Sequence, residues 1–159
     1  MINDIHDLGL VLDSKVKLVV IESWDERRVL ETLTSLAVKR GLGLFTWAVT
    51  EGLQRLGFAA DVNEESASLE PEAALKLIKH DPQPNLYVLC DLHPFLVDNP
   101  KLVRLLKEIA LAEGAHKPTL VLVSHALKLP VEVQRYAARF ALALPSEDEL
   151  LAIVRDEAT

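Results

Sequence analysis

Residues 17–30 read Lys-Leu-Val-Val-Ile-Glu-Ser-Trp-Asp-Glu-Arg-Arg-Val-Leu, an apolar strand that runs into a helix with no glycine between them. In a nucleotide-binding α/β domain this junction holds a bare loop, whose backbone N–H groups bind phosphate at the positive end of the helix. Here Asp25 and Glu26 already occupy that position. Ser23 and Glu26 also match a capping box, in which a hydroxyl and a carboxylate bind the free donors. The stretch therefore predicts a nucleotide-binding scaffold with a closed phosphate site.

The rest of the chain repeats the alternation of apolar strand and amphipathic helix. We expect strands at residues 18–21, 44–49, 86–91, 119–123 and 140–144, and helices at 1–14, 24–40, from 71, from 100, around 130–138 and after 146. Residues 50–69 are predicted to form a loop or an insertion. Strands that are apolar on both faces and separated by helices predict a parallel sheet covered on both sides. We therefore expect a single α/β domain over residues 1–159, in which an N-terminal helix (1–14) precedes a core (16–159).

Charge and composition exclude several classes of protein. The net charge of −7 leaves no basic surface for DNA or RNA, so nucleic acid is not an expected partner. The chain has no apolar run of about 20 residues and no signal-peptide pattern, which predicts a cytoplasmic protein without a membrane partner. The single cysteine, Cys90, lies inside an apolar run, where a buried and unreactive thiol is expected.

Three stretches carry a resemblance to a known family, namely residues 19–30, 44–53 (Leu-Phe-Thr-Trp-Ala-Val-Thr-Glu-Gly-Leu) and 86–96 (Leu-Tyr-Val-Leu-Cys-Asp-Leu-His-Pro-Phe-Leu). Together with residues 119–124, 129–130 and 144–150 they resemble the N-terminal region of poorly characterised AAA+ ATPases of bacteria and plastids. The resemblance implies a domain that precedes a catalytic AAA+ module and is itself a degenerate, P-loop-lacking ATPase fold. We therefore expect a three-layer sandwich with a five-stranded parallel sheet, RecA/AAA-like topology and strand order 5-1-4-3-2.

Candidate binding residues follow the strands. Ligands of open parallel sheets bind outside the carboxyl ends of the strands, so Glu22, Thr50, Asp91 and Ser124 are the candidate nucleotide-binding residues and are expected to converge. Asp91 ends an apolar strand as a Walker-B aspartate does, but Leu92 stands where a catalytic glutamate would follow. No segment matches G-x-x-x-x-G-K-[ST]. Without that lysine and that glutamate, phosphoryl transfer lacks its main electrostatic support, so no catalytic residue is assigned.

Three other site chemistries have weaker support. A receiver-type signalling domain would also use Asp91 and Ser124, but its fifth strand should end in Lys-Pro, whereas this chain has Leu144-Pro145. His93 and His125, with Asp91 and Glu22, form a mixed nitrogen and oxygen set whose spacing is not diagnostic, so no metal is assigned. The nucleophile-elbow motif G-x-S-x-G of hydrolases is absent.

The sequence thus predicts a non-catalytic accessory or assembly domain that acts by protein–protein contact. Exposed apolar residues are the expected interface, and the candidates are Trp24, Trp47, Phe95 and Leu96. The resemblance implies that the partner is a AAA+ module in cis or on related subunits, with a homo-oligomer as a further arrangement. ATP and Mg would belong to that downstream module, and this chain itself needs no cofactor. The competing interpretation is a domain that binds a nucleotide or another small molecule at the strand ends.

Overall fold

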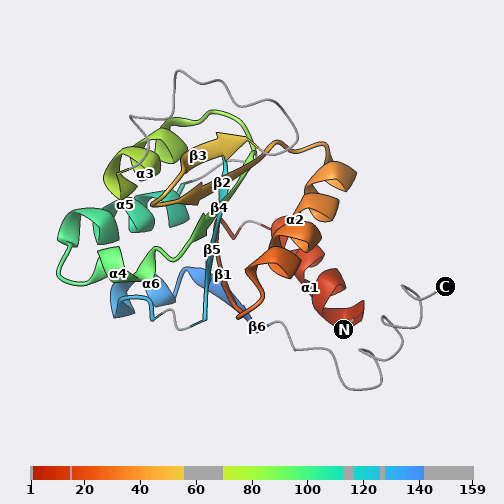
Figure 1. Ribbon diagram of the computed structural model, residues 1–159. Coiled ribbons are helices and arrows are strands. Elements are labelled where there is room, and N and C mark those ends of the chain that lie inside the picture. Colours follow the sequence, from red (N-terminus) through yellow and green to blue (C-terminus); the bar gives the residue numbers. More distant parts are fainter. Residues whose placement is uncertain (1, 15, 56–69, 113–116, 126–127, 142–159) are drawn as a thin grey trace.

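A six-stranded sheet lies between two layers of helices (Figure 1). The computed structural model describes residues 2–14, 16–55, 70–112, 117–125 and 128–141. The strands are β1 (Leu18–Glu22), β2 (Leu44–Ala48), β3 (Gly52–Arg55), β4 (Leu86–Cys90), β5 (Thr119–Ser124) and β6 (Ala137–Ala141). The helices are α1 (Ile2–Leu12), α2 (Glu26–Arg40), α3 (Pro71–His80), α4 (His93–Leu96), α5 (Pro100–Ala110) and α6 (Val131–Gln134). The predicted α/β class is confirmed. Within the described ranges, no helix has both the length and the apolar character needed to cross a membrane.

The strand order is β3-β2-β4-β5-β1-β6, and every neighbouring pair is parallel except β2 with β3. The five expected strands occur in it in the predicted relative order. The prediction of a five-stranded, all-parallel sheet is wrong, because β3 adds an antiparallel edge strand. This strand lies inside residues 50–69, where the sequence predicts a loop. Its four residues, Gly-Leu-Gln-Arg, contain one large apolar side chain, so neither length nor alternation indicated a strand.

The last described strand, β6, begins three residues before the predicted strand at 140–144. It pairs with β1 from Ala137 opposite Leu18 to Ala141 opposite Glu22. Arg139 interrupts the apolar pattern in this segment, but an edge strand tolerates a charged, partly exposed side chain. Residues 142–159, which include Leu144-Pro145 and the expected C-terminal helix, lie outside the described residues.

Alternate side chains of the central strands build two cores. Leu18 and Val20 of β1 pack in the core that contains the buried residues of α3 and α5. Val19 and Ile21 pack in the other core, against the buried face of α2. This alternation follows from the period of two in a β-strand, and it explains why the strands are apolar on both faces.

The helices divide between the two faces of the sheet according to the direction of each crossover. Figure 1 shows α1 and α2 on one side and α3, α4, α5 and α6 on the other. The connection after β1 crosses the sheet in one direction, to β2 near one edge. The later connections cross it in the opposite direction, through β4 and β5 to β6 at the other edge. Right-handed crossovers in opposite directions place their helices on opposite faces. The helices after the neighbouring strands β1 and β5 therefore diverge, which creates a switch point at the carboxyl ends of these strands.

Arg40, the last residue of α2, joins this helix to α1. Its Nε and Nη2 atoms donate hydrogen bonds to the two carboxylate oxygens of Asp13 at 2.7 and 2.9 Å. Nη2 also donates to the carbonyl oxygen of Gly9 at 3.1 Å. The hydrogen bond from Arg40 lowers the pKa of Asp13 below its usual 3.8, and burial opposes this shift only in part. The N-terminal helix is therefore held to α2 by a guanidinium as well as by apolar packing.

We expect Arg40→Ala to lower the free energy of unfolding by about 1 kcal/mol at pH 7, a modest value because solvent screens the half-exposed carboxylate. The folded-state pKa of Asp13 is lowered, so the stability of the pair is complete above 3.8 and is lost as the pH falls through the folded-state pKa. Denaturant unfolding at pH 7 and at about pH 2 should therefore show a smaller penalty in acid. Lys39→Ala, an exposed neighbour, is the control and should cost little. An equal penalty at both pH values would contradict this account.

Candidate functional site

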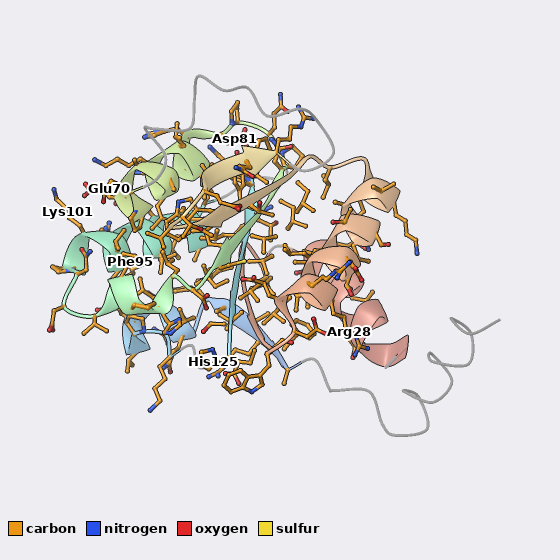
Figure 2. The ribbon with its side chains drawn as sticks, in the orientation of Figure 1. Arg28, Glu70, Asp81, Phe95, Lys101 and His125 are labelled. Atoms are coloured by element: carbon orange, nitrogen blue, oxygen red, sulfur yellow. The ribbon has the colours of Figure 1, made fainter. Side chains whose placement is uncertain are left out.

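A small pocket lies outside the carboxyl ends of β1, β4 and β5, at the switch point of the sheet. Its volume is about 160 Å³, and it is lined by Ser23, Trp24, Glu26, Asp91, Val123, Ser124 and His125. Figure 2 shows His125 at the lower side of the molecule, far from Asp81 at the top. Three segments that are distant in the sequence thus meet because parallel pairing aligns the ends of their strands. We call this cavity the switch-point pocket.

The structure brings together two of the four candidate binding residues. Asp91 and Ser124 both line the switch-point pocket. Glu22 lies next to it at the end of β1, but its carboxylate pairs with Arg139 of β6, on the side of β1 opposite β5. Thr50 is exposed in the turn between β2 and β3, and two strands separate β2 from β1. The expectation that all four converge is therefore wrong for Thr50, because β2 lies near the edge of the sheet.

Polar groups in the loop between β1 and α2 are hydrogen-bonded to other groups of the same chain. Asp25, rather than Ser23, caps the helix, and its Oδ1 atom accepts a hydrogen bond from the N–H of Arg28 at 3.1 Å. The hydroxyl of Ser23 accepts from the N–H of Asp25 at 3.0 Å. The N–H of Ser23 donates to the carbonyl oxygen of Ser124 at 3.2 Å. The predicted Ser23–Glu26 capping box is wrong in register, since the cap lies two residues later, but a carboxylate does occupy the start of the helix.

Aromatic and hydroxyl side chains form one wall of the pocket. Trp24 is 78% exposed and stacks on His125, with ring centroids 4.1 Å apart and an interplanar angle of 21°. The ring of His93 meets His125 edge-on at 5.9 Å. His93 Nδ1 also lies 2.9 Å from the hydroxyl of Ser124, which is almost fully buried. In the part of the chain that the structure describes, no group of three His, Cys, Asp or Glu side chains is placed to hold a metal ion.

Asp91 directly follows β4 and has a left-handed backbone conformation, with φ of 55°. Aspartate and asparagine adopt this region more readily than most residues. The N–H of Asp91 donates to the carbonyl oxygen of Val123 at 3.1 Å, which continues the pairing of β4 with β5. Leu92, which follows it, is buried in the core. The Walker-B-like position thus has an exposed carboxylate with an apolar residue after it.

Cys90 is buried beside the pocket, as the sequence predicts. Burial is the largest cause of the raised pKa of its thiol, and a hydrogen bond with Glu26 raises it further. The thiol therefore stays protonated, and it gives the Glu26 carboxylate a donor beneath the pocket.

The four predicted interface residues differ widely in exposure. Trp24 is exposed, whereas Trp47 and Leu96 are buried, at 1% and 6% exposure. Phe95 is half-buried and packs edge-on against Trp47, with centroids 6.1 Å apart. The prediction that Trp47 and Leu96 are exposed is wrong, because both belong to the core beneath α3 and α5.

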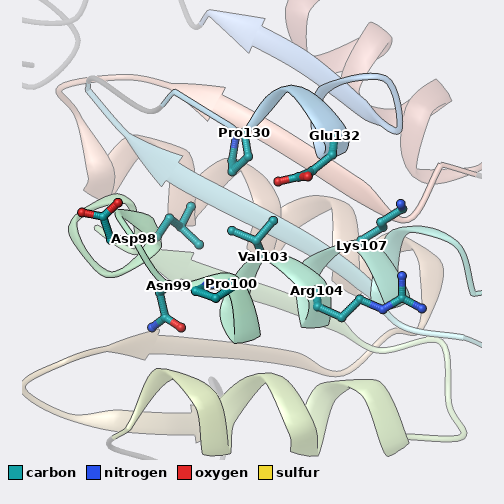
Figure 3. A pocket seen from close by; sticks show the side chains of 9 residues that line it. Asp98, Asn99, Pro100, Val103, Arg104, Lys107, Pro130 and Glu132 are labelled. Atoms are coloured by element: carbon teal, nitrogen blue, oxygen red, sulfur yellow. The ribbon is translucent and has the colours of Figure 1, made fainter.

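A second and larger cavity, of about 440 Å³, was not predicted from the sequence. It lies between α5 and the start of α6, with Val103, Arg104 and Lys107 facing Pro130 and Glu132 (Figure 3). Leu96, Asp98, Asn99 and Pro100 complete its lining. No local pattern could have indicated it, because its two walls are about 30 residues apart in the chain and meet only after the helices pack.

Comparison with known proteins adds three findings. The family profile described as SpoVK-like AAA ATPase, N-terminal domain matches residues 4–142. Among solved structures, the chain is similar to a chain in the structure of Drosophila ORC bound to DNA, with a TM-score of 0.52 and 12% identity. That alignment covers 98% of this chain and 32% of the other, so this chain spans about a third of its length. At this identity the likeness supports the fold alone. No curated protein matches the chain.

We expect Cys90 to resist alkylation in the folded protein. Iodoacetamide at about pH 8 reacts with thiolate, and burial of this side chain keeps the thiolate fraction very low. Mass spectrometry should therefore show no adduct until the chain is unfolded in guanidinium. Glu26→Gln should increase the rate only slightly, since burial is the main cause of the raised pKa. Fast alkylation of the native protein would contradict this account of the pocket floor.

Proposed function

The chain belongs to the SpoVK-like AAA ATPase N-terminal domain family, and from this premise we propose that it is a non-catalytic domain that acts by contact with a AAA+ module. ATP and Mg bind that module, in the same protein or on a related subunit, and not this chain. The cytoplasmic location and the absence of nucleic acid among the partners remain predictions from composition.

One observation carries the proposal, namely that acceptors of the chain itself bind backbone N–H groups at the junction between β1 and α2. An active P-loop leaves its backbone N–H groups open toward phosphate. Here the Asp25 carboxylate accepts from the N–H of Arg28, and the N–H groups of Ser23 and Asp25 also have partners within the protein. A phosphate group would have to displace a carboxylate of the same charge to reach the start of α2.

The dimensions and charge of the switch-point pocket support the same conclusion. Small-molecule and cofactor sites usually enclose about 300–1,000 Å³. This pocket has about 160 Å³, and the charged residues in its lining are the acids Glu26 and Asp91. It is therefore too small for a nucleotide and has the wrong charge for a triphosphate.

The competing function is a small-molecule site at the strand ends, which the meeting of Asp91 and Ser124 in one pocket favours. The two functions differ in what stabilises the folded chain. A small ligand that binds only the native state raises the melting temperature by itself, whereas a contact domain is stabilised by its protein partner.

We expect about 5 mM Mg-ATP or Mg-ADP to leave the melting temperature of the chain unchanged. A nucleotide present at 100 times its Kd would add about 2.7 kcal/mol and shift the transition by several degrees. Differential scanning fluorimetry measures the shift, and the AAA+ module under the same conditions serves as the positive control. A reproducible rise for this chain, or ATP turnover by it alone, would refute the non-catalytic assignment.

We also expect the chain to bind the AAA+ module of its own protein when the two are produced separately. Size-exclusion chromatography with light scattering should show a complex whose mass includes both components. Trp24→Ala should weaken this complex, because the exposed indole lies beside the pocket, whereas Leu10→Ala, at another exposed apolar position, should not. Failure of the wild-type chain to bind the module at micromolar concentrations would count against the contact role.

A further inference from the structure

We propose that the switch-point pocket receives an arginine side chain of the partner protein. This inference rests on the proposed contact function and specifies its chemistry. The pocket occupies the position where a phosphate would lie in a nucleotide-binding relative of the fold, but its charge is suited to a cation. The argument depends on the charge of the lining, the exposed aromatic ring and the volume.

The lining has two carboxylates, one imidazole (His125) and no lysine or arginine. Glu26 approaches from the start of α2, and Asp91 approaches from the end of β4. Arg139 of the neighbouring strand β6 is paired with Glu22 outside the pocket. The Cys90 thiol is a weak, uncharged donor to Glu26 and adds no positive charge to the site. A guanidinium in the pocket would provide the compensating charge and donors for both carboxylates.

Trp24 adds a feature that does not depend on the acidic residues. One face of the indole stacks on His125, which holds the ring at the mouth of the pocket. Because the side chain remains 78% exposed, its other face is open to a partner. A cation placed over a tryptophan face is attracted by the ring quadrupole, and arginine makes this contact more often than lysine. The ring is thus positioned beside the carboxylates before any ligand binds.

The volume fits the end of a side chain. The pocket of about 160 Å³ equals the share of roughly five water molecules in the liquid, at about 30 Å³ each. This holds a planar guanidinium and a few waters but excludes a nucleotide or an entire peptide. Arginine is preferred to lysine because its fork donates to two carboxylates, it stacks on aromatic rings and it is more weakly hydrated.

The direct test uses N-acetyl-arginine amide as the probe and the indole N–H signal of Trp24 in the NMR spectrum as the readout. The buried Trp47 provides an internal reference. We expect a saturable shift of the Trp24 signal with the arginine probe, a weaker response to N-acetyl-lysine amide and none to the neutral citrulline analogue. Asp91→Asn should weaken binding about tenfold, since it removes one charged hydrogen-bond partner. Trp24→Ala, followed by backbone signals, should weaken it about two- to fivefold.

Asp98→Asn is a matched control, because Asp91 and Asp98 both have positive φ, at 55° and 51°, and asparagine is tolerated there. Asp98 lines the other cavity, so its variant should bind the probe as the wild type does. Equal affinity for the citrulline analogue, an equal loss in both variants, or no shift at tens of millimolar probe would overturn the inference.

Binding of the AAA+ module separates this inference from the proposed function. If the module binds wild type and Asp91→Asn equally well, the arginine pocket is refuted and the contact function stands. If the arginine probe binds but the module does not, the contact function fails, and the assignment of the arginine to the module fails with it. Loss of the module only in Asp91→Asn, with Asp98→Asn unaffected, supports both.

Discussion

The parallel pairing of β1 between β5 and β6 is the constraint on which the other features depend. It places β1 inside the sheet, where one face packs against α2 and the other packs in the core of α3 and α5. The helix that follows β1 lies on the face opposite the one that α6 covers. The carboxyl ends of β1, β4 and β5 therefore lie side by side, with Ser23, Asp91 and Ser124 at one edge. Without this pairing the residues of the pocket would have no common position.

The charge at this edge distinguishes the chain from an active nucleotide-binding domain. A helix start attracts anions when its donors are open and its loop is bare. In this chain Asp25 binds a donor at that start, and Glu26 and Asp91 add negative charge to the same small cavity. The pocket thus lies where the phosphate site of a nucleotide-binding domain would lie. Its carboxylates favour a cation, whereas a phosphate site favours an anion. This reversal connects the absence of the P-loop motif in the sequence to the contact role that we propose for the domain.

Much of the fold could be predicted because long apolar runs and the helix signals between them are local properties. The five parallel strands and helices α2, α3 and α5 follow from such patterns, whereas the relative order of the strands is what the family resemblance implies. The strand β3 could not be predicted, since Gly52–Arg55 has one large apolar side chain and is stabilised by its pairing with β2. Burial of Trp47 was missed for a related reason. Its strand lies near the edge of the sheet, but Phe95 and the helices cover the face on which it packs.

The sequence by itself determined the α/β class, the family resemblance, the acidic groups at the first crossover and the absence of a G-x-x-x-x-G-K-[ST] motif. These features depend on residue identity and on short-range spacing. Only the tertiary structure decided that Asp91 and Ser124 share a pocket while Thr50 does not, that Glu22 pairs with Arg139, and that Trp24 stands exposed on His125. The physical reason is that strand order and side-chain packing join segments more than 100 residues apart, such as those of Glu22 and Arg139, and no local pattern specifies which of them meet.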